Sequence, residues 1–483
     1  MVTEEAPFAL DKAAQAISRI ADGIIAAAHE LAPMPHIPRI NIAANSATTR
    51  LFVQWIRSAA PYIYALRGKT LVIAFGGEVV ADDTFLGIIH DLNLLHSLGT
   101  RLVIVHGSRP QIEVILKQQS IPSRYNRGLR VTDAETLDCV LEGTGHARSR
   151  IEALLSLGVA NSPMAGARIR VVGGNFLTAK PIGVLDGIDM QWTGEVRRVD
   201  VEAIKQRLDD GDIVLVSPVG YSPTGEIFNL ALEEVATQVA VRLSAHKLMF
   251  LMDTEGVREG RRKLLTELST RDADALLARR GKLPPDVQLY LPSAVRACDN
   301  GVKRAHLISR HHDGALLLEL FTRDGVGTMV SAGPLANLRS ATIDDVGGIL
   351  AIIEPLEEDG VLVRRPRERL EMEIERFVVA EHDDVIIGCA ALYAFPSDKA
   401  GELAALAVHP DFRREGYGEA LLHEIEARAR KLHLARLFVL TTRTSGWFVE
   451  RGFVESDPGR LPKQKRDLYN WQRRSLVYER ALA

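Results

Sequence analysis

The sequence predicts two α/β domains in one chain, the first with a doubly wound, mostly parallel sheet and the second with a mixed sheet. A continuous apolar run at residues 70–74 and a second strand-like run at 100–106 each lead into a glycine turn, as buried parallel strands do. A separate pattern of strand, glycine loop and helix occupies residues 402–432. The length of 483 residues also exceeds that of one ordinary domain.

Changes in composition divide the chain into four parts. Residues 1–49 are rich in alanine, carry acidic residues that oppose an organellar transit peptide, and are expected to be partly helical or mobile. The first domain spans residues 50–330 and opens with a helical pattern that we expect Pro61 to kink or divide. A linker at 331–337 leads to the second domain at 338–483.

Overall composition favours small-molecule chemistry. A net charge of −3 and a pI near 6.6 provide no general attraction to nucleic acid or to an anionic membrane. No apolar run approaches the roughly 18 residues of a transmembrane helix. Cys139, Cys298 and Cys389 are scattered without a C-x-x-C pair, which suits a reducing compartment. We therefore expect a cytoplasmic protein with no structural metal.

A glycine loop before a helix carries the clearest chemical signal. Arg413, Gly416 and Gly418 stand immediately before a run whose apolar residues recur at helical spacing. Backbone N–H groups at a helix start have no intrahelical partner and, with the helix dipole, can hold a pyrophosphate. Glycine permits close approach there, and Arg413 or Arg414 can add positive charge.

The surroundings of this loop extend the pattern. A strand-like run at 402–409 leads through V-x-P into the loop, a second strand follows the helix at 436–442, and W-F-V-E-R-G-F follows at 447–453. This order resembles the GNAT family of acetyl-CoA-dependent N-acetyltransferases. The resemblance implies that acetyl-CoA is the co-substrate and that a backbone N–H group of residue 407 or 408 binds the thioester carbonyl. The cofactor-binding residues that it implies are Ala407, Val408, Arg413, Arg414, Gly416, Tyr417 and Gly418.

Acetyl transfer to an amine also requires a proton acceptor. The amine of a free amino acid is largely protonated at neutral pH, so a carboxylate must take its proton directly or through water. Glu402 begins the strand that leads to the loop and is the candidate base, while Thr441 is the candidate donor to the leaving thiolate. Position 405 is alanine and Cys389 has no evident base, so we expect direct attack in a ternary complex.

The first domain resembles the amino-acid kinase family, most closely its acetylglutamate kinase branch. Matching pieces include VIAFGGE at 72–78 and KLMFLMDTEGV at 247–257. Ala74 stands where these kinases carry a phosphate-binding lysine, Ser108-Arg109 interrupts their glycine-rich turn, and residues 229–233 lack their metal-organising aspartate. Phosphoryl transfer depends on positioning and charge stabilisation, so the departures imply a catalytically silent domain.

A silent kinase-like domain can still bind a regulator. In arginine-inhibited members of the acetylglutamate kinase branch, L-arginine is held by a Tyr, a His, a Glu and a Gly. The corresponding positions here are Tyr62, His306, Glu319 and Gly325. A carboxylate is the expected partner for a guanidinium group. The family also forms rings through the N-terminal helix, so we expect a homo-oligomer such as a hexamer, with Phe52, Trp55 and Ile56 on its contact surface.

Basic residues indicate the acceptor. A dicarboxylic amino acid needs more than one cation, which Arg364 or Arg365 and the Arg473-Arg474-Ser475 segment supply. The joined domains resemble the bacterial N-acetylglutamate synthase family, whose acceptor is L-glutamate and whose feedback inhibitor is L-arginine. That resemblance implies substrate contacts from Arg364, Arg473 and Ser475.

Three other functions remain open at this stage. A bifunctional synthase and acetylglutamate kinase would retain phosphoryl transfer, which Ala74 opposes. An arginine sensor with a non-catalytic acetyltransferase part is opposed by the glycine loop and Glu402. An acetyltransferase could also use a different acceptor, such as lysine or a protein N-terminus.

Overall fold

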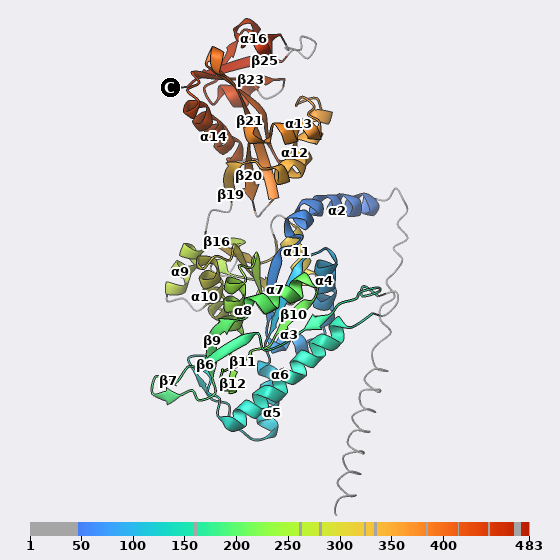
Figure 1. Ribbon diagram of the computed structural model, residues 1–483, viewed down its shortest axis with the longest axis vertical. Helices are drawn as coiled ribbons and strands as arrows, with labels where there is room; N and C mark the ends of the chain where they lie inside the picture. Colours follow the sequence, from blue (N-terminus) through green and yellow to red (C-terminus); the bar gives the residue numbers. More distant parts are fainter. Residues whose placement is uncertain are drawn as a thin grey trace, which may run out of the picture.

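The computed structural model describes residues 47–158, 162–259, 263–279, 283–322, 325–332, 336–382, 385–413, 415–442, 445–467 and 475–482. The predicted extension at 1–49 lies almost wholly outside these residues. The chain forms two α/β domains, and they lie one above the other along the longest axis (Figure 1). This confirms the predicted fold class.

An eight-stranded sheet forms the centre of the first domain, in the order β16-β18-β17-β13-β1-β2-β10-β5. Neighbouring strands are parallel except β17 and β18. The strands are β1 (Thr70–Phe75), β2 (Arg101–His106), β5 (Val171–Val172), β10 (Ile213–Val216), β13 (Lys247–Met252), β16 (Glu267–Ser269), β17 (Arg304–Ser309) and β18 (Thr328–Ser331). The predicted buried strands therefore lie at the middle of the sheet.

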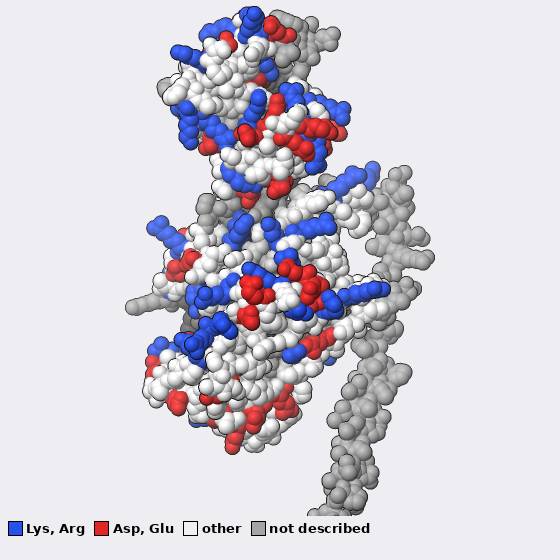
Figure 2. All heavy atoms as spheres, viewed as in Figure 1, with Lys and Arg blue, Asp and Glu red and all other residues white. Residues whose placement is uncertain are grey.

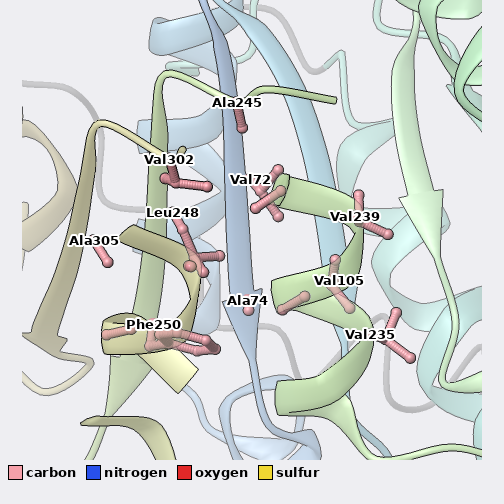
Figure 3. Packing of buried hydrophobic residues seen from close by; sticks show 14 of the residues in the cluster. Val72, Ala74, Val105, Val235, Val239, Ala245, Leu248, Phe250, Val302 and Ala305 are labelled. Carbon is pink, nitrogen blue, oxygen red and sulfur yellow. The ribbon is translucent and has the colours of Figure 1, made fainter. Parts of the chain in front are cut away.

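Helices cover both faces of this sheet. They are α2 (Ala47–Leu66), α3 (Gly77–Ala81), α4 (Phe85–Ser97), α5 (Arg109–Gln118), α6 (Ala134–Leu155), α7 (Val201–Asp209), α8 (Leu232–Arg242), α9 (Thr270–Ala278), α10 (Pro285–Asp299) and α11 (Ala315–Phe321). Val72 and Ala74 of β1 pack in the core beneath α8 and α10 (Figure 3). Because strand side chains alternate, Leu71 and Ile73 belong to the opposite core. One strand thus supplies two apolar cores.

Shorter strands complete the first domain. A four-stranded sheet combines β6 (Leu177–Pro181), β9 (Gly194–Val199), β11 (Val219–Tyr221) and β12 (Ile227–Asn229). Three two-stranded sheets pair β3 (Tyr125–Asn126) with β4 (Leu129–Arg130), β7 (Val184–Leu185) with β8 (Ile188–Asp189), and β14 (Arg258–Glu259) with β15 (Lys263–Leu264). Pro61 lies inside the single helix α2, so of the two predicted effects, a kink or a division, the division is wrong. Proline removes only one backbone N–H donor, and Ala59 and Leu66 on either side of it are buried in the core beneath the helix.

A seven-stranded sheet forms the second domain, in the order β19-β20-β21-β22-β23-β25-β24. The strands are β19 (Ala336–Ser340), β20 (Phe377–His382), β21 (Val385–Phe395), β22 (Ala400–Val408), β23 (Arg436–Thr441), β24 (Val454–Ser456) and β25 (Leu476–Ala481), and the helices are α12 (Val346–Glu358), α13 (Arg367–Met372), α14 (Tyr417–Lys431), α15 (Ser445–Val449) and α16 (Lys463–Arg466). Only β22 and β23 run parallel. The predicted strand and helix are β22 and α14, and the described loop residues between them include a short 3-10 helix at Pro410–Phe412 and Gly416.

Charge is mixed over the visible surface of both domains. Lys and Arg side chains lie among Asp and Glu side chains on the face shown in Figure 2. Within the described part of the chain, none of the helices combines the length and apolarity needed to cross a membrane.

Candidate active site

Strands β22 and β23 separate part-way along the second sheet. Their pairing covers only Ala400–Glu402 opposite Arg436–Phe438, although β22 continues to Val408 and β23 to Thr441. A bulge at Ala405, whose φ is 51°, bends β22 where the strands part. The unpaired edge of β22 therefore faces a cleft, with Glu402 at the fork.

Backbone geometry selects one of the two predicted oxyanion donors. The His409 N–H group donates to the carbonyl of Ile387 on β21 at 2.7 Å. Successive N–H groups along a strand point in opposite directions, so the Val408 N–H group points toward the open side and the Ala407 N–H group toward β21. Val408 is therefore the better-oriented donor to a thioester carbonyl.

The glycine loop lies beside this open edge. Gly416 precedes α14 with a φ of 87°, a left-handed conformation that glycine adopts without strain. Arg413 Nε donates to the Val408 carbonyl at 3.4 Å, which ties the loop to the end of β22. A Cβ atom on Gly418 would lie 3.4 Å from the Trp447 ring. The start of a helix, here that of α14, directs backbone N–H groups toward a position where phosphate oxygens can bind. Arg414 lies outside the described residues.

One cleft of about 1750 Å³ brings most of the predicted residues together. Its wall includes Glu402, Ala407, Val408, Arg413, Gly416, Tyr417, Gly418, Thr441 and Ser475. These residues come from β22, the glycine loop, β23 and the segment before β25. The volume is large enough for both a nucleotide cofactor and an amino acid.

Glu402 has an ion-pair partner that sequence reasoning missed. Lys465 Nζ on α16 lies 2.7 Å from Glu402 Oε1. Glu402 stands opposite Tyr393 on one neighbouring strand and opposite Phe438 on the other. Lys465 comes from a run of basic residues, and nothing in that run distinguishes it from Lys463.

Cations gather on the β21 side of the cleft. Arg365, Arg369 and Arg376 line it, and Arg376 lies over the Tyr393 ring, 4.8 Å from its centroid. The Tyr393 hydroxyl donates to Glu373 at 2.6 Å. Burial alone would raise the pKa of Glu373, but this hydrogen bond and the charge of Arg369 lower the pKa overall.

The structure distinguishes the two arginines that the sequence left open for acceptor binding. Arg365 is half-buried and lines the cleft, whereas the implied Arg364 is exposed and is not part of its wall. Ser475 is buried beside the cleft. Arg473 lies outside the described residues.

The predicted regulator residues converge in the first domain. His306 Nδ1 lies 2.7 Å from Glu319 Oε1, and the N–H groups of Val326 and Gly327 donate to Glu319 Oε2 at 2.7 and 2.9 Å. Lys247 Nζ lies 3.4 Å from His306 Nε2, so His306 accepts at Nε2 and donates from Nδ1 to Glu319. Burial alone would raise the pKa of Glu319, but these hydrogen bonds and His306 lower it.

The other two predicted regulator residues lie close to Glu319 or to its helix. Gly325 has a φ of 60°, and a Cβ atom there would meet Glu319 Oε2 at 2.4 Å. Tyr62 of α2 packs against the apolar core that contains Leu316 and Leu320 of α11. A buried, ionised carboxylate held by backbone N–H groups is suited to binding a cationic ligand.

A small pocket remains where the kinase resemblance places phosphoryl transfer. Gly76, Gly77 and Gly107 line it, and a Cβ atom on Gly107 would lie 3.1 Å from the Gly76 backbone. Ala74 is buried in β1, so no cation extends from this position. Among the described residues, no group of three His, Cys, Asp or Glu side chains could hold a metal ion.

Comparisons with known proteins agree with both domains. The amino acid kinase family matches residues 69–309 and the acetyltransferase (GNAT) family matches residues 349–453. An amino-acid acetyltransferase of Azotobacter vinelandii is 54% identical over 434 residues, which cover 90% of this chain and 100% of the relative. The chain belongs to the amino-acid acetyltransferase family. A Pseudomonas fluorescens member is 53% identical over 431 residues, covering 89% of this chain and 99% of that one.

Two solved structures match across both domains. The crystal structure of N-acetylglutamate synthase from Neisseria gonorrhoeae complexed with coenzyme A and L-arginine has a TM-score of 0.72 and 39% identity, covering 89% of this chain and 99% of that chain. The same enzyme complexed with coenzyme A and N-acetyl-glutamate has a TM-score of 0.56 and 40% identity, with the same coverage. The resemblances to both families are thereby confirmed.

Proposed function

We propose that this chain is an N-acetylglutamate synthase, which transfers the acetyl group of acetyl-CoA to the α-amine of L-glutamate and is regulated by L-arginine. The fork between β22 and β23 carries this proposal, because it places Glu402, the Val408 N–H group and the glycine loop on one cleft. The solved synthase with coenzyme A and either L-arginine or N-acetyl-glutamate supports the choice of ligands.

The cleft residues support direct attack. The start of α14 binds the cofactor diphosphate, and the Val408 N–H group donates to the thioester carbonyl as it becomes an oxyanion. Glu402 takes one proton from the acceptor ammonium, and the lone pair of the resulting amine forms the bond to the carbonyl carbon. The carbon–sulfur bond then breaks, and the second proton that the nitrogen loses passes to the departing thiolate. Thr441 lies on the same wall and donates a hydrogen bond to the departing thiolate.

Arg365, with Arg369 and Arg376, gives the acceptor side of the cleft the positive charge that a dicarboxylic amino acid requires. In the first domain, the Glu319 carboxylate accepts hydrogen bonds from the guanidinium group of L-arginine. Phosphoryl transfer is silent there, because Ala74 supplies no cation and the backbones at Gly76 and Gly107 lie close together.

The helix α2 supports assembly into a homo-oligomer. Phe52, Trp55 and Ile56 are 50%, 45% and 45% exposed, and together they present an apolar face. We assign this face to contact with another copy of the chain, and we expect the enzyme to act in the cytoplasm.

Thiol release with acetyl-CoA tests the function. Among L-glutamate, L-glutamine, L-lysine and a peptide N-terminus, L-glutamate is expected to give the highest kcat/KM, with N-acetyl-L-glutamate as product. ATP with N-acetyl-L-glutamate is expected to give no acyl phosphate. A preference for another acceptor would reject the proposed substrate, and ATP-dependent phosphorylation would reject the silent kinase-like domain.

A further inference from the structure

The mechanism of direct attack gives no role to Lys465, although this lysine forms an ion pair with the proposed base. Lys465 Nζ approaches Glu402 Oε1 to 2.7 Å, and the side chains are 27% and 8% exposed, respectively. Both side chains line the cleft. The Glu402 carboxylate is therefore buried, whereas the Lys465 side chain remains accessible to a ligand in the cleft.

Packing places this lysine independently of the ion pair. Leu461, just before α16, is buried against Ala400 and Phe438 on the sheet face that also bears Glu402. The Lys465 N–H group donates to the Pro462 carbonyl at 2.9 Å and closes the turn. The chain thus brings the lysine to the fork through apolar burial and backbone hydrogen bonds.

The ion pair occupies the carboxylate that the acceptor ammonium must reach. Lys465 Nζ lies 2.7 Å from Glu402 Oε1 and takes a place where an N–H group of the acceptor would otherwise donate. Glu402 is therefore most open to the acceptor when Lys465 has another anion to bind. Lysine suits such an exchange, because its compact charge has three donors on a flexible four-carbon stem.

The acceptor carries that anion. In an α-amino acid the amine and the carboxylate share one carbon, which places a carboxylate oxygen about 3 Å from the amine nitrogen. An amine held at Glu402 thus brings its own carboxylate within reach of Lys465 Nζ, which starts 2.7 Å from Glu402.

We propose that Lys465 is a positioning residue that binds the α-carboxylate of the acceptor and, by leaving Glu402 for it, frees Glu402 to take the amine proton. The inference rests on the proposed function, because it concerns the amino acid that the cleft accepts. It couples recognition of an α-amino acid to activation of the base. An amine without a neighbouring carboxylate leaves Lys465 on Glu402.

Equilibrium binding measurements test the role of Lys465 separately from catalysis. The probe is N-acetyl-L-glutamate, titrated calorimetrically into the coenzyme A-loaded full chain. Lys465→Met is expected to weaken binding about tenfold, since a hydrogen-bonded charge is lost, and Lys465→Arg to retain affinity within about threefold. Lys463→Met alters an exposed lysine of the same helix and is expected to leave the Kd unchanged. In turnover assays, Lys465→Met should raise the L-glutamate KM and leave the acetyl-CoA KM within about twofold.

A double-mutant cycle separates partner exchange from a purely structural pair. Glu402→Gln removes the competitor for Lys465, so N-acetyl-L-glutamate is expected to bind about threefold more tightly. That gain should vanish in Glu402→Gln with Lys465→Met. A Kd within twofold of wild type in Lys465→Met, or an equal gain with and without Lys465, would overturn the inference.

The controls keep the two proposals apart. A wild-type chain that neither acetylates L-glutamate nor binds N-acetyl-L-glutamate rejects the proposed function itself. A working wild type with an unaltered Lys465→Met rejects only the role of Lys465. Should Lys465→Met fail to fold, Lys465→Arg and Lys465→Gln supply the same comparison, because both keep a long polar side chain.

Discussion

Glu402 shows how one residue depends on its place in a sheet. It is the last residue of β22 that pairs with β23, and it is buried at the point where the cleft begins. Glu402→Gln keeps the side-chain shape and removes the proton acceptor. We expect kcat for L-glutamate to fall about 100-fold or more, with the acetyl-CoA KM little changed. Steady-state kinetics that show an undiminished kcat would exclude Glu402 as the base.

Two adjacent arginines provide a matched comparison. Arg365 lines the cleft, whereas the sequence resemblance implied Arg364, which is exposed beside it. Arg365→Ala is expected to raise the L-glutamate KM about tenfold or more, because a charged hydrogen bond to a carboxylate is lost. Arg364→Ala tests the resemblance under the same conditions. A larger KM increase for Arg364→Ala than for Arg365→Ala would return the acceptor contact to Arg364.

Asp91 gives a pH prediction far from the active site. Burial in α4 and the like charge of Asp313 raise the pKa of Asp91 to about 7 from 3.8. Between these values the folded chain binds more protons than the unfolded chain, so stability falls as pH rises through this window. Asp91→Asn cannot ionise, and we expect it to stabilise the fold by up to about 4 kcal/mol at pH 8 and by little near pH 4.

Urea unfolding at the two pH values measures this effect. The exposed Asp83→Asn serves as the control on the same segment. An Asp91→Asn variant with the same stability change at both pH values would contradict the raised pKa.

At the scale of single elements, the glycine loop before α14 joins conformation to cofactor binding. Gly416 has a φ of 87° with no atom within 4 Å of an added Cβ, so a substitution there strains the backbone without a clash. Gly416→Ala is expected to raise the acetyl-CoA KM about tenfold through misdirected N–H groups. Gly301→Ala, with a φ of 100° and equally open surroundings in the first domain, should lower stability and leave that KM unchanged. Equal KM values for the two variants would reject the assignment.

Helices and strands that depend on the nearby sequence alone could be predicted. The buried strands of the first domain and the strand, loop and helix of the second follow from apolar periodicity and glycine placement. The ion-pair partner of Glu402 could not be predicted, because Lys465 is brought to Glu402 by the packing of Leu461 on the sheet. The choice between Arg364 and Arg365 also depends on a turn whose direction only the tertiary structure sets.

In the whole molecule, the predicted regulator residues and the cleft of the second domain lie in different domains. The two domains touch at an ion pair, in which Glu267 Oε1 of β16 lies 3.8 Å from His382 Nε2 of β20. His382 Nδ1 lies 3.5 Å from the Tyr417 hydroxyl beside the glycine loop. Strand β16 pairs with β18, which follows the Glu319-bound segment. The proposed regulation by L-arginine therefore requires a change in the arrangement of domains or subunits, which is a coupling of two sites.

The most direct test is the response of glutamate acetylation to L-arginine in wild type and in Glu319→Gln. Both chains are expected to acetylate L-glutamate with kcat values within about threefold of each other, because Glu319 lies outside the acetyl cleft. L-Arginine should change the wild-type rate, and Glu319→Gln should require at least about tenfold more L-arginine for the same change, since the buried carboxylate is lost. An identical arginine response in the two chains, or none in wild type, would contradict the account.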